Sequence, residues 1–184
     1  MAEKYCPILI QADGIEPVPS HIYYRMAEDE NRILIACHIA WPYERDERSQ
    51  GLAAAWNKLF YTGGLKLQTK IFGPEDIEAI EIVLDKTSRK IIRIRYESAS
   101  HRSQEKTGEE IANIEKPYFE VTTWNHMFEL KSPEQANGKR IYQLKPEYFT
   151  DDLWDYYKII KKRQTLFSQN RAHFEWEQKP GSRN

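Results

Sequence analysis

The chain has 184 residues, of which 40% are hydrophobic and 30% charged, so it is too apolar for a disordered protein and fits one domain. Its 27 basic and 28 acidic residues leave a net charge of −1, and we expect no nucleic-acid partner because nucleic acids usually select a clear basic excess. Aromatic residues make up 12% of the chain and suit half-buried strands, which favours a mainly β fold over a helical bundle.

The N-terminal residues predict the compartment. Residues 1–10 lack the basic leader and the small-residue cleavage site of a signal peptide, and no stretch is long enough to form a transmembrane segment. Cys6 and Cys37 fall in apolar segments that predict strands. A disulfide between them is one alternative, and two buried thiols in a reducing compartment are the one that we favour. We therefore expect a cytoplasmic protein.

Most of the chain predicts strands separated by turn residues. The clearest element is a hairpin, in which Ile92, Ile94 and Tyr96 alternate with charged residues along the second arm. Residues 43–50 and 98–116 are polar and predict loops. The expected strands are 5–11, 21–26, 32–41, 65–72, 78–85, 91–97, 118–130 and 141–144.

Two segments predict helices. Residues 52–61 combine helix formers with apolar residues at helical spacing, and Gly63-Gly64 supplies a stop. Thr150 caps a second segment, 151–167, whose early acids and late bases match the helix dipole and whose apolar stripe packs on the sheet. We expect an antiparallel β-sandwich over 1–146, a C-terminal helical extension of the same domain over 147–177, and a frayed tail over 178–184.

None of the common catalytic motifs is present. The sequence has no phosphate-binding glycine loop, dinucleotide fingerprint, Cys-x-x-Cys pair, His-Glu-x-x-His or Gly-x-Ser-x-Gly. The usual nucleotide and hydrolase chemistries therefore have no local support, and the sequence leaves open whether the chain is an enzyme.

Acids and histidines at the ends of expected strands form a candidate site. If the backbone is already extended at residues 76–78, Asp76 and Glu78 point to the same face. Two neighbouring carboxylates repel each other and are usually held by a cation or a base. His101 follows the second arm of the hairpin, and His126 lies in an aromatic segment. These four residues predict a divalent-metal site that does not distinguish Ca²⁺, Mg²⁺ and Zn²⁺, or else an acid/base cluster.

Residues 20–130 resemble two β-sandwich families that carry a His-Glu-Gly-Asp-Trp-Glu or Gly-His-Arg-His-Asp-Trp-Glu signature. These are the vacuolar-protein-sorting-associated family and the necrosis- and ethylene-inducing proteins. The similar features are the strands near 22–25 and 41–43, the acidic run 75–78 with the strand after it, and the histidine positions.

The resemblance implies a β-sandwich fold and gives the candidate residues a role. Asp76 and Glu78 match the acidic pair of the signature, whereas His101 and His126 match the downstream histidines by their order. Two positions depart from the signature: Ile77 stands where the families have tryptophan, and Gly73 stands where they have a leading histidine. The necrosis-inducing proteins are also secreted, whereas no leader is expected here.

Each feature has a simpler explanation. Residues 74–76 could begin a helix, since proline followed by acids is a common helix start. The two carboxylates could be ordinary surface acids, His101 an exposed loop residue and His126 a core histidine, as we expect of His21 and His38. The leading hypothesis is a divalent-metal-binding β-sandwich with a hydrolase-like site. The alternatives are a non-enzymatic binding or assembly module, which uses an aromatic surface or a sheet edge, and a metal site that has decayed.

Overall fold

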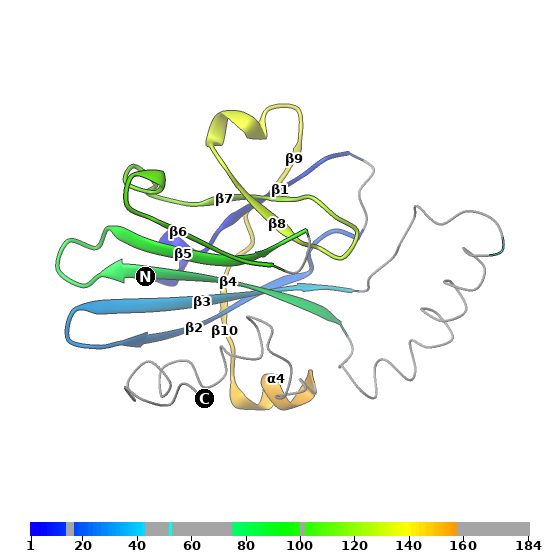
Figure 1. Ribbon diagram of the computed structural model, residues 1–184. Helices are drawn as coiled ribbons and strands as arrows, with labels where there is room; N and C mark the ends of the chain where they lie inside the picture. Colours follow the sequence, from blue (N-terminus) through cyan, green and yellow to red (C-terminus); the bar gives the residue numbers. More distant parts are fainter. Residues whose placement is uncertain (14–16, 43–51, 53–74, 100–101, 158–184) are drawn as a thin grey trace.

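Strands dominate the chain and form two sheets (Figure 1). The computed structural model describes residues 1–13, 17–42, 52, 75–99 and 102–157. A six-stranded sheet has the order β10-β2-β3-β4-β5-β6, and a four-stranded sheet has the order β8-β7-β1-β9. The predicted mainly β fold is confirmed.

The six-stranded sheet consists of β2 (His21–Glu28), β3 (Arg32–Trp41), β4 (Asp76–Asp85), β5 (Ile91–Ser98), β6 (Arg102–Thr107) and β10 (Glu147–Tyr148). The four-stranded sheet consists of β1 (Ile8–Gln11), β7 (Tyr118–Val121), β8 (Phe128–Lys131) and β9 (Arg140–Tyr142). The described helices are α1 (Ala2–Tyr5), η2 (Gly108–Glu110), η3 (Pro133–Ala136) and α4 (Asp151–Tyr156).

Most neighbouring strands are antiparallel, but two pairs are parallel. β1 pairs with β7 and β10 pairs with β2 in parallel, so both sheets are mixed rather than antiparallel throughout. Each parallel pair joins segments more than a hundred residues apart in the sequence. The direction of two paired strands depends on how the chain between them runs, and hydrophobic periodicity within a strand does not report that direction. The two parallel pairs were therefore not predicted.

The central strand β3 is buried on both faces. Its Ile33, Ile35 and Ile39 belong to a core that also contains Leu9 and Phe119 of the four-stranded sheet, so the two sheets share one hydrophobic core. The opposite face is buried in a smaller cluster with the C-terminal segment, which contains Tyr23, Ala40, Ile77, Ala79, Phe149 and Tyr157. This double burial explains why β3 is a continuous apolar run, whereas β5 alternates.

The C-terminal segment is attached through both its backbone and its side chains. Arg25 of β2 donates a 2.8 Å hydrogen bond from Nε to the Phe149 carbonyl and forms an ion pair with Asp151. As predicted, α4 begins after Thr150, whose hydroxyl accepts a hydrogen bond from the backbone N–H of Leu153 at 3.2 Å. The remainder of the predicted helix 151–167, beyond residue 157, lies outside the described residues.

Three local predictions were wrong. Residues 98–116 were expected to be loop but contain β6, an exposed edge strand that is held by backbone pairing with β5 and therefore shows no apolar alternation. Residues 118–130 were expected to form one strand, but they form β7 and β8 with a turn between them. The predicted strand 5–11 begins only at Ile8, and Tyr5 is the last residue of α1. The predicted helix 52–61, apart from Leu52, and the predicted strand 65–72 lie outside the described residues.

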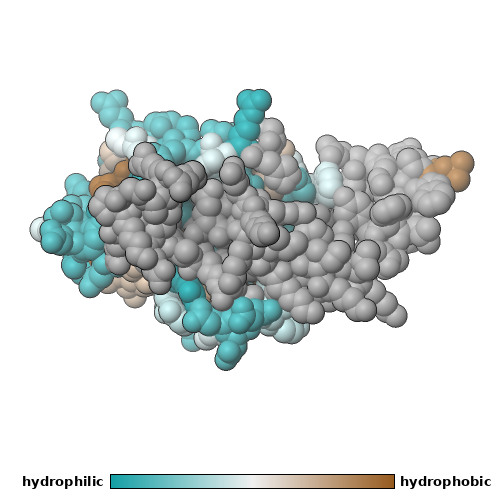
Figure 2. Space-filling model, turned by 60° about the horizontal axis from the view of Figure 1, so that its bottom comes forward, coloured by the Kyte–Doolittle hydropathy of each residue, from teal (hydrophilic) through white to brown (hydrophobic). Residues whose placement is uncertain are grey.

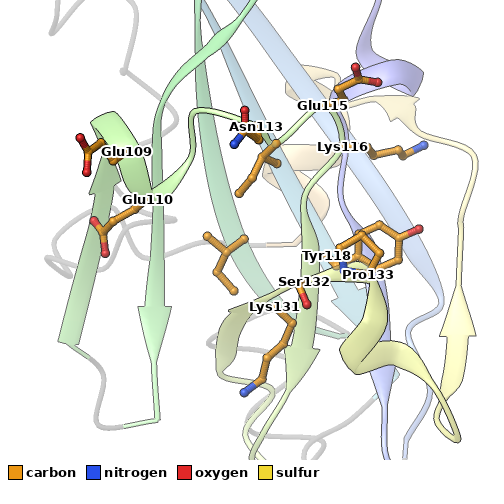
Figure 3. A pocket seen from close by; sticks show the side chains of 11 residues that line it. Glu109, Glu110, Asn113, Glu115, Lys116, Tyr118, Lys131, Ser132 and Pro133 are labelled. Atoms are coloured by element: carbon orange, nitrogen blue, oxygen red, sulfur yellow. The ribbon is translucent and has the colours of Figure 1, made fainter.

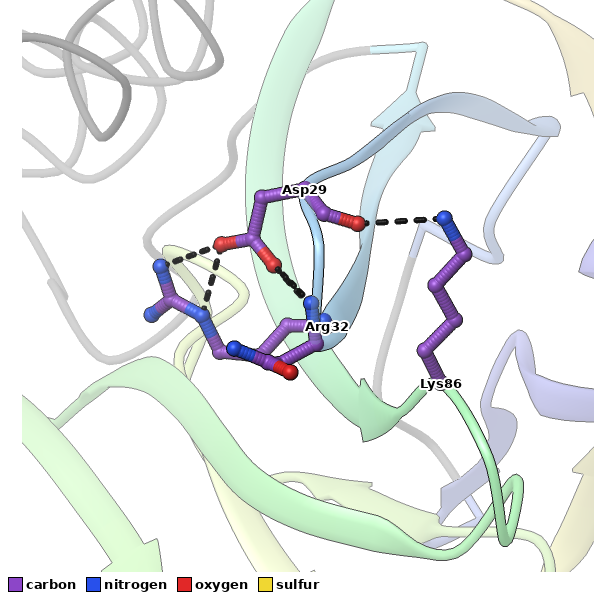
Figure 4. A network of polar contacts seen from close by, with 4 residues as sticks. Asp29, Arg32 and Lys86 are labelled. Atoms are coloured by element: carbon purple, nitrogen blue, oxygen red, sulfur yellow. Dashed lines mark hydrogen bonds and ion pairs between the residues drawn. The ribbon is translucent and has the colours of Figure 1, made fainter.

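The turn between β2 and β3 is fastened by Asp29 (Figure 4). Its Oδ1 accepts hydrogen bonds from the backbone N–H groups of Asn31 and Arg32 at 2.9 and 2.7 Å, and its Oδ2 accepts two from the Arg32 guanidinium. These hydrogen bonds lower the pKa of the Asp29 carboxyl. Lys86 donates a 3.1 Å hydrogen bond to the Asp29 carbonyl, which ties the β2–β3 turn to the β4–β5 turn.

The described residues on the face shown in Figure 2 are mostly hydrophilic, with hydrophobic residues in small separate areas. Most aromatic side chains of the described residues are at least partly buried; Tyr148 and Tyr156 are exposed. No helix in the described ranges is long and apolar enough to cross a membrane.

Candidate functional site

The acidic pair lies at the beginning of β4. Asp76 is the first residue of this strand and pairs with Trp41, while Glu78 pairs with Ile39. The strand prediction for residues 76–78 is therefore confirmed over the helix alternative, and alternation places both carboxylates on the sheet face that carries the shared core. Both residues are partly exposed, so solvent reaches this end of the core.

Asp76 contacts one of the two predicted histidines. His126 Nδ1 lies 2.7 Å from Asp76 Oδ2, and the His126 side chain is fully buried whereas the Asp76 side chain is 20% exposed. An ionised carboxylate only accepts hydrogen bonds, so the imidazole donates. The structure thus brings His126 to Asp76, and it places Glu78 on the same sheet face as Asp76, two residues further along β4. His101 lies outside the described residues.

The turn between β7 and β8 holds His126 in an unusual backbone conformation. Its φ is 58°, in the left-handed region that few non-glycine residues occupy. The backbone N–H of His126 donates to the Thr123 carbonyl at 3.0 Å, the N–H of Met127 donates to Thr123 Oγ1 at 3.0 Å, and the N–H of Thr122 donates to the Met127 carbonyl at 2.9 Å. Strained backbone that is held by a dense hydrogen-bond network is common at functional sites.

Trp41 fixes the plane of the imidazole. The two rings stack with centroids 4.4 Å apart and an interplanar angle of 4°, and both side chains are fully buried. Among the described residues, neither Trp41 Nε1 nor His126 Nε2 has a hydrogen-bond partner. Buried polar atoms seldom stay unsatisfied, so these two ring nitrogens mark a polar end of the core.

The role of Trp41 was missed in the sequence. The only signal was its position as the last aromatic residue of an apolar strand, and such residues usually belong to the core. Its pairing with Asp76 depends on the β3–β4 register, which joins segments separated by 34 residues. That register was not predictable from either strand alone.

Glu75 was also missed, and it is held from the other face of the sheet. The Tyr157 hydroxyl donates a 2.7 Å hydrogen bond to Glu75 Oε2, and the Ser20 hydroxyl lies 3.4 Å from Oε1. Burial, together with hydrogen bonds to Tyr23 and Glu75, raises the pKa of Tyr157, so its hydroxyl is protonated and serves as the donor. The consecutive acids Glu75 and Asp76 are thus anchored on opposite faces of one sheet.

The donor atoms of this site fit some metal ions better than others. Within the described ranges, no group of three or more His, Cys, Asp and Glu residues could hold a metal ion. A closed structural zinc site needs four protein ligands, so the described residues do not fit one. Two adjacent carboxylates do fit a hydrated hard cation, since Mg²⁺ keeps several waters and commonly binds through one or two carboxylates.

A groove of about 620 Å³ lies elsewhere, between the segment around η2 and the segment from β7 to η3 (Figure 3). Ile114, Tyr118 and Leu130 provide apolar lining, and Glu109 and Glu110 lie on one side of it. The groove shares no residue with the site at Asp76. It was not predicted, because one wall comes from residues 109–116, which were expected to be irregular, and the other from residues that were expected to form one continuous strand.

Comparison with known proteins supports the fold. No family model matches the sequence, and no curated protein matches it. Similar solved structures are NLPPya in complex with mannosamine, at 10% identity and a TM-score of 0.53, and NLPPya in complex with glucosamine, at 12% identity and a TM-score of 0.53. Both alignments cover 94% of this chain, and they cover 87% and 86% of the other chains.

The fold is that of the necrosis- and ethylene-inducing proteins. Another similar structure is described as a toxin fold as basis for microbial attack and plant defense. It is 14% identical to this chain with a TM-score of 0.51, and the alignment covers 94% of this chain and 87% of the other. The resemblance predicted from the sequence is confirmed at the level of the fold.

Proposed function

We propose that this protein binds a hydrated divalent cation through the carboxylates of Asp76 and Glu78, with His126 as the residue that positions Asp76. The observation that carries the proposal is the 2.7 Å contact between His126 Nδ1 and Asp76 Oδ2, next to a second carboxylate on the same sheet face. Mg²⁺ and Ca²⁺ are the ions that this oxygen-rich arrangement suits best.

His126 orients the first carboxylate. Its N–H occupies Oδ2 of Asp76, which leaves Oδ1 of the same group for the cation. The stack on Trp41 and the left-handed turn hold the imidazole in place, so the carboxylate does not need to be ordered when the cation arrives. An outer hydrogen-bond partner of this kind typically changes metal affinity by about 10- to 100-fold.

Glu78 supplies the second oxygen ligand. It lies two residues along the same extended strand, so its carboxylate and that of Asp76 share one face and repel each other when both are ionised. A bound dication removes that repulsion. The remaining coordination positions belong to water, because both residues are partly exposed.

Calorimetric titration of chelator-treated protein tests the proposal. We expect saturable binding of Mg²⁺ or Ca²⁺ by the wild type and at least about 10-fold weaker binding by Asp76→Asn and by Glu78→Gln. Glu109→Gln is the matched control, because it removes an exposed carboxylate that lies next to β6, away from the Asp76 end of β4, and should leave binding unchanged. The proposal fails if the folded wild type binds neither ion at millimolar concentration, or if Asp76→Asn binds as tightly as the wild type.

The groove near η2 supports a second candidate function, a non-enzymatic binding module. Its volume suits a small molecule, and its lining combines apolar side chains with carboxylates. Titration with glucosamine and mannosamine, the molecules in the similar NLPPya complexes, is a direct probe. Loss of binding in Leu130→Asp but not in Asp76→Asn would favour the groove over the acidic site. Cytoplasmic location and the absence of a nucleic-acid partner stay predictions.

A further inference from the structure

Two cysteines that the candidate site does not use meet inside the core. Cys6 follows α1 and Cys37 lies in the middle of β3, and their Sγ atoms are 2.9 Å apart. Both thiols are free and buried, with 2% and 0% of their surfaces exposed. They are 31 positions apart in the sequence and belong to the same core cluster, so the fold itself brings them together.

We propose that Cys6 and Cys37 form an intramolecular disulfide bond, which links the N-terminal segment covalently to the central strand of the six-stranded sheet. A disulfide has an S–S length of about 2.05 Å, so the sulfurs need to approach by about 0.9 Å from their present 2.9 Å. A shift of this size is within reach of side-chain rotation.

The oxidant for this bond is a small disulfide such as oxidised glutathione. One cysteine thiolate attacks a glutathione sulfur, forms a mixed disulfide and releases one glutathione thiolate. The second cysteine thiolate then attacks the protein sulfur of the mixed disulfide and releases the other glutathione thiolate. In total, two protein thiols and one glutathione disulfide become one protein disulfide and two glutathione thiols, so atoms and electrons balance.

Burial determines when the reaction takes place. Desolvation and the contact with Cys6 raise the pKa of the Cys37 thiol well above its ordinary value, so the closed core holds little reactive thiolate. Cys6 directly follows α1, whose Ala2 and Tyr5 belong to the same core cluster as the pair, and a helix of only four residues has little stability of its own. The bond therefore forms during folding or during transient opening of this segment, and the refolded core then shields it.

The bond also has a mechanical consequence. It closes a loop that contains β1, β2 and the first half of β3, which restricts the unfolded chain more than the folded one. Typical disulfide stabilisation in a chain of this length corresponds to a rise in Tm of roughly 5 to 15 °C. The oxidised N-terminal segment can no longer detach from β3.

Refolding of the full chain in glutathione buffers tests the proposal. The protein is denatured, refolded at a series of reduced-to-oxidised glutathione ratios, and analysed by free-thiol titration and intact mass. We expect a monomer that has lost both free thiols and two hydrogens, with a higher Tm than the reduced protein. The variants Cys6→Ala and Cys37→Ala each lack the bond, and their Tm should not respond to the buffer.

The free-thiol titration and intact mass of the wild type test the proposal even if a cysteine variant fails to fold. Two free thiols after refolding in the most oxidising buffer would overturn the proposal. Mixed glutathione adducts or disulfide-linked dimers without the intramolecular bond would overturn it as well. An intramolecular bond that leaves cation titration unchanged would keep this inference separate from the site at Asp76.

Discussion

Tyr157 donates a 2.7 Å hydrogen bond to Glu75, and this contact joins the end of the described chain to the residue just before β4. Tyr157 is buried against Tyr23 and Phe149, with its hydroxyl 3.2 Å from that of Tyr23. The C-terminal segment therefore holds one of two consecutive acids, while the β7–β8 turn holds the other. The backbone at the start of β4 is fixed from both faces of the sheet.

The variant Tyr157→Phe tests this attachment. It keeps the aromatic packing and removes the hydrogen bond to the Glu75 carboxylate together with the longer one between the Tyr23 and Tyr157 hydroxyls. We expect the free energy of unfolding to fall by about 1.5 to 3 kcal/mol, mainly from the bond to the carboxylate. Chemical denaturation measures the change. Tyr156→Phe is the matched control, because Tyr156 is 60% exposed and its loss of a hydroxyl should have little effect. Equal stability of the two variants would show that the Tyr157–Glu75 contact does not hold the segment.

Backbone strain at His126 predicts an unusual order of stability between two variants. His126→Gly and His126→Ala both remove the stack on Trp41 and the contact with Asp76, but only glycine accepts a φ of 58° without cost. We expect the glycine variant to be more stable than the alanine variant by up to about 1 kcal/mol.

The matched control for this order is Glu129, an exposed residue of the edge strand β8. Glycine weakens strands, so Glu129→Gly should be less stable than Glu129→Ala, the reverse of the order at His126. Thermal denaturation of all four variants measures both differences. If alanine were the more stable substitution at both positions, the left-handed backbone at His126 would store no strain.

Burial of His38 predicts a dependence of stability on pH. Desolvation, and to a lesser extent the charge of Arg25, lowers the pKa of His38 from 6.5 to about 3. Between pH 6.5 and about 3 the unfolded chain takes up a proton that the folded chain does not, so stability is lost as the pH falls through this window. The largest slope from one such group is about 1.4 kcal/mol per pH unit.

Denaturation at several pH values between 4 and 7 measures this slope. His38→Gln should reduce the slope, whatever it does to stability at pH 7. His21→Gln is the control, because His21 is an exposed histidine of the neighbouring strand β2, and the difference between the slopes of the two variants measures the effect of burying His38. An unchanged slope in His38→Gln would mean that other groups cause the acid sensitivity.

The turn network around Asp29 gives a fourth prediction. Asp29→Ala removes the acceptor for two backbone N–H groups and for the Arg32 guanidinium, so we expect a loss of about 1 to 2 kcal/mol in the free energy of unfolding. Glu30→Ala, in the same turn, is the control because Glu30 is exposed. Equal stability of the two variants would show that the network in Figure 4 does not restrain the turn.

Local patterns predicted those parts of the fold that have a clear periodicity or a cap. The hairpin of β4 and β5 followed from alternation along residues 91–97, and the start of α4 followed from Thr150. The edge strand β6 was not predicted, because all its side chains are polar and its pairing with β5 depends on backbone atoms that carry no sequence signal.

The candidate site also has one part that local sequence predicts and another that depends on long-range packing. Asp76 and Glu78 share a face because side chains alternate along any strand, so their placement was predictable from local sequence. The contact of Asp76 with His126 crosses from one sheet to the turn of the other, and the stack on Trp41 depends on a long-range register. Resemblance to a family suggested which histidines to consider, but it did not identify Trp41 or Glu75.

The amino-acid sequence by itself determined that this chain is rich in strands and that two carboxylates lie side by side at the start of β4, because both are consequences of local periodicity. Only the tertiary structure decided what those carboxylates meet. His126 and Tyr157 reach Asp76 and Glu75 from segments 50 and 82 residues away, through sheet packing and a left-handed turn. Contacts over such distances depend on how whole elements pack, and no local pattern encodes that.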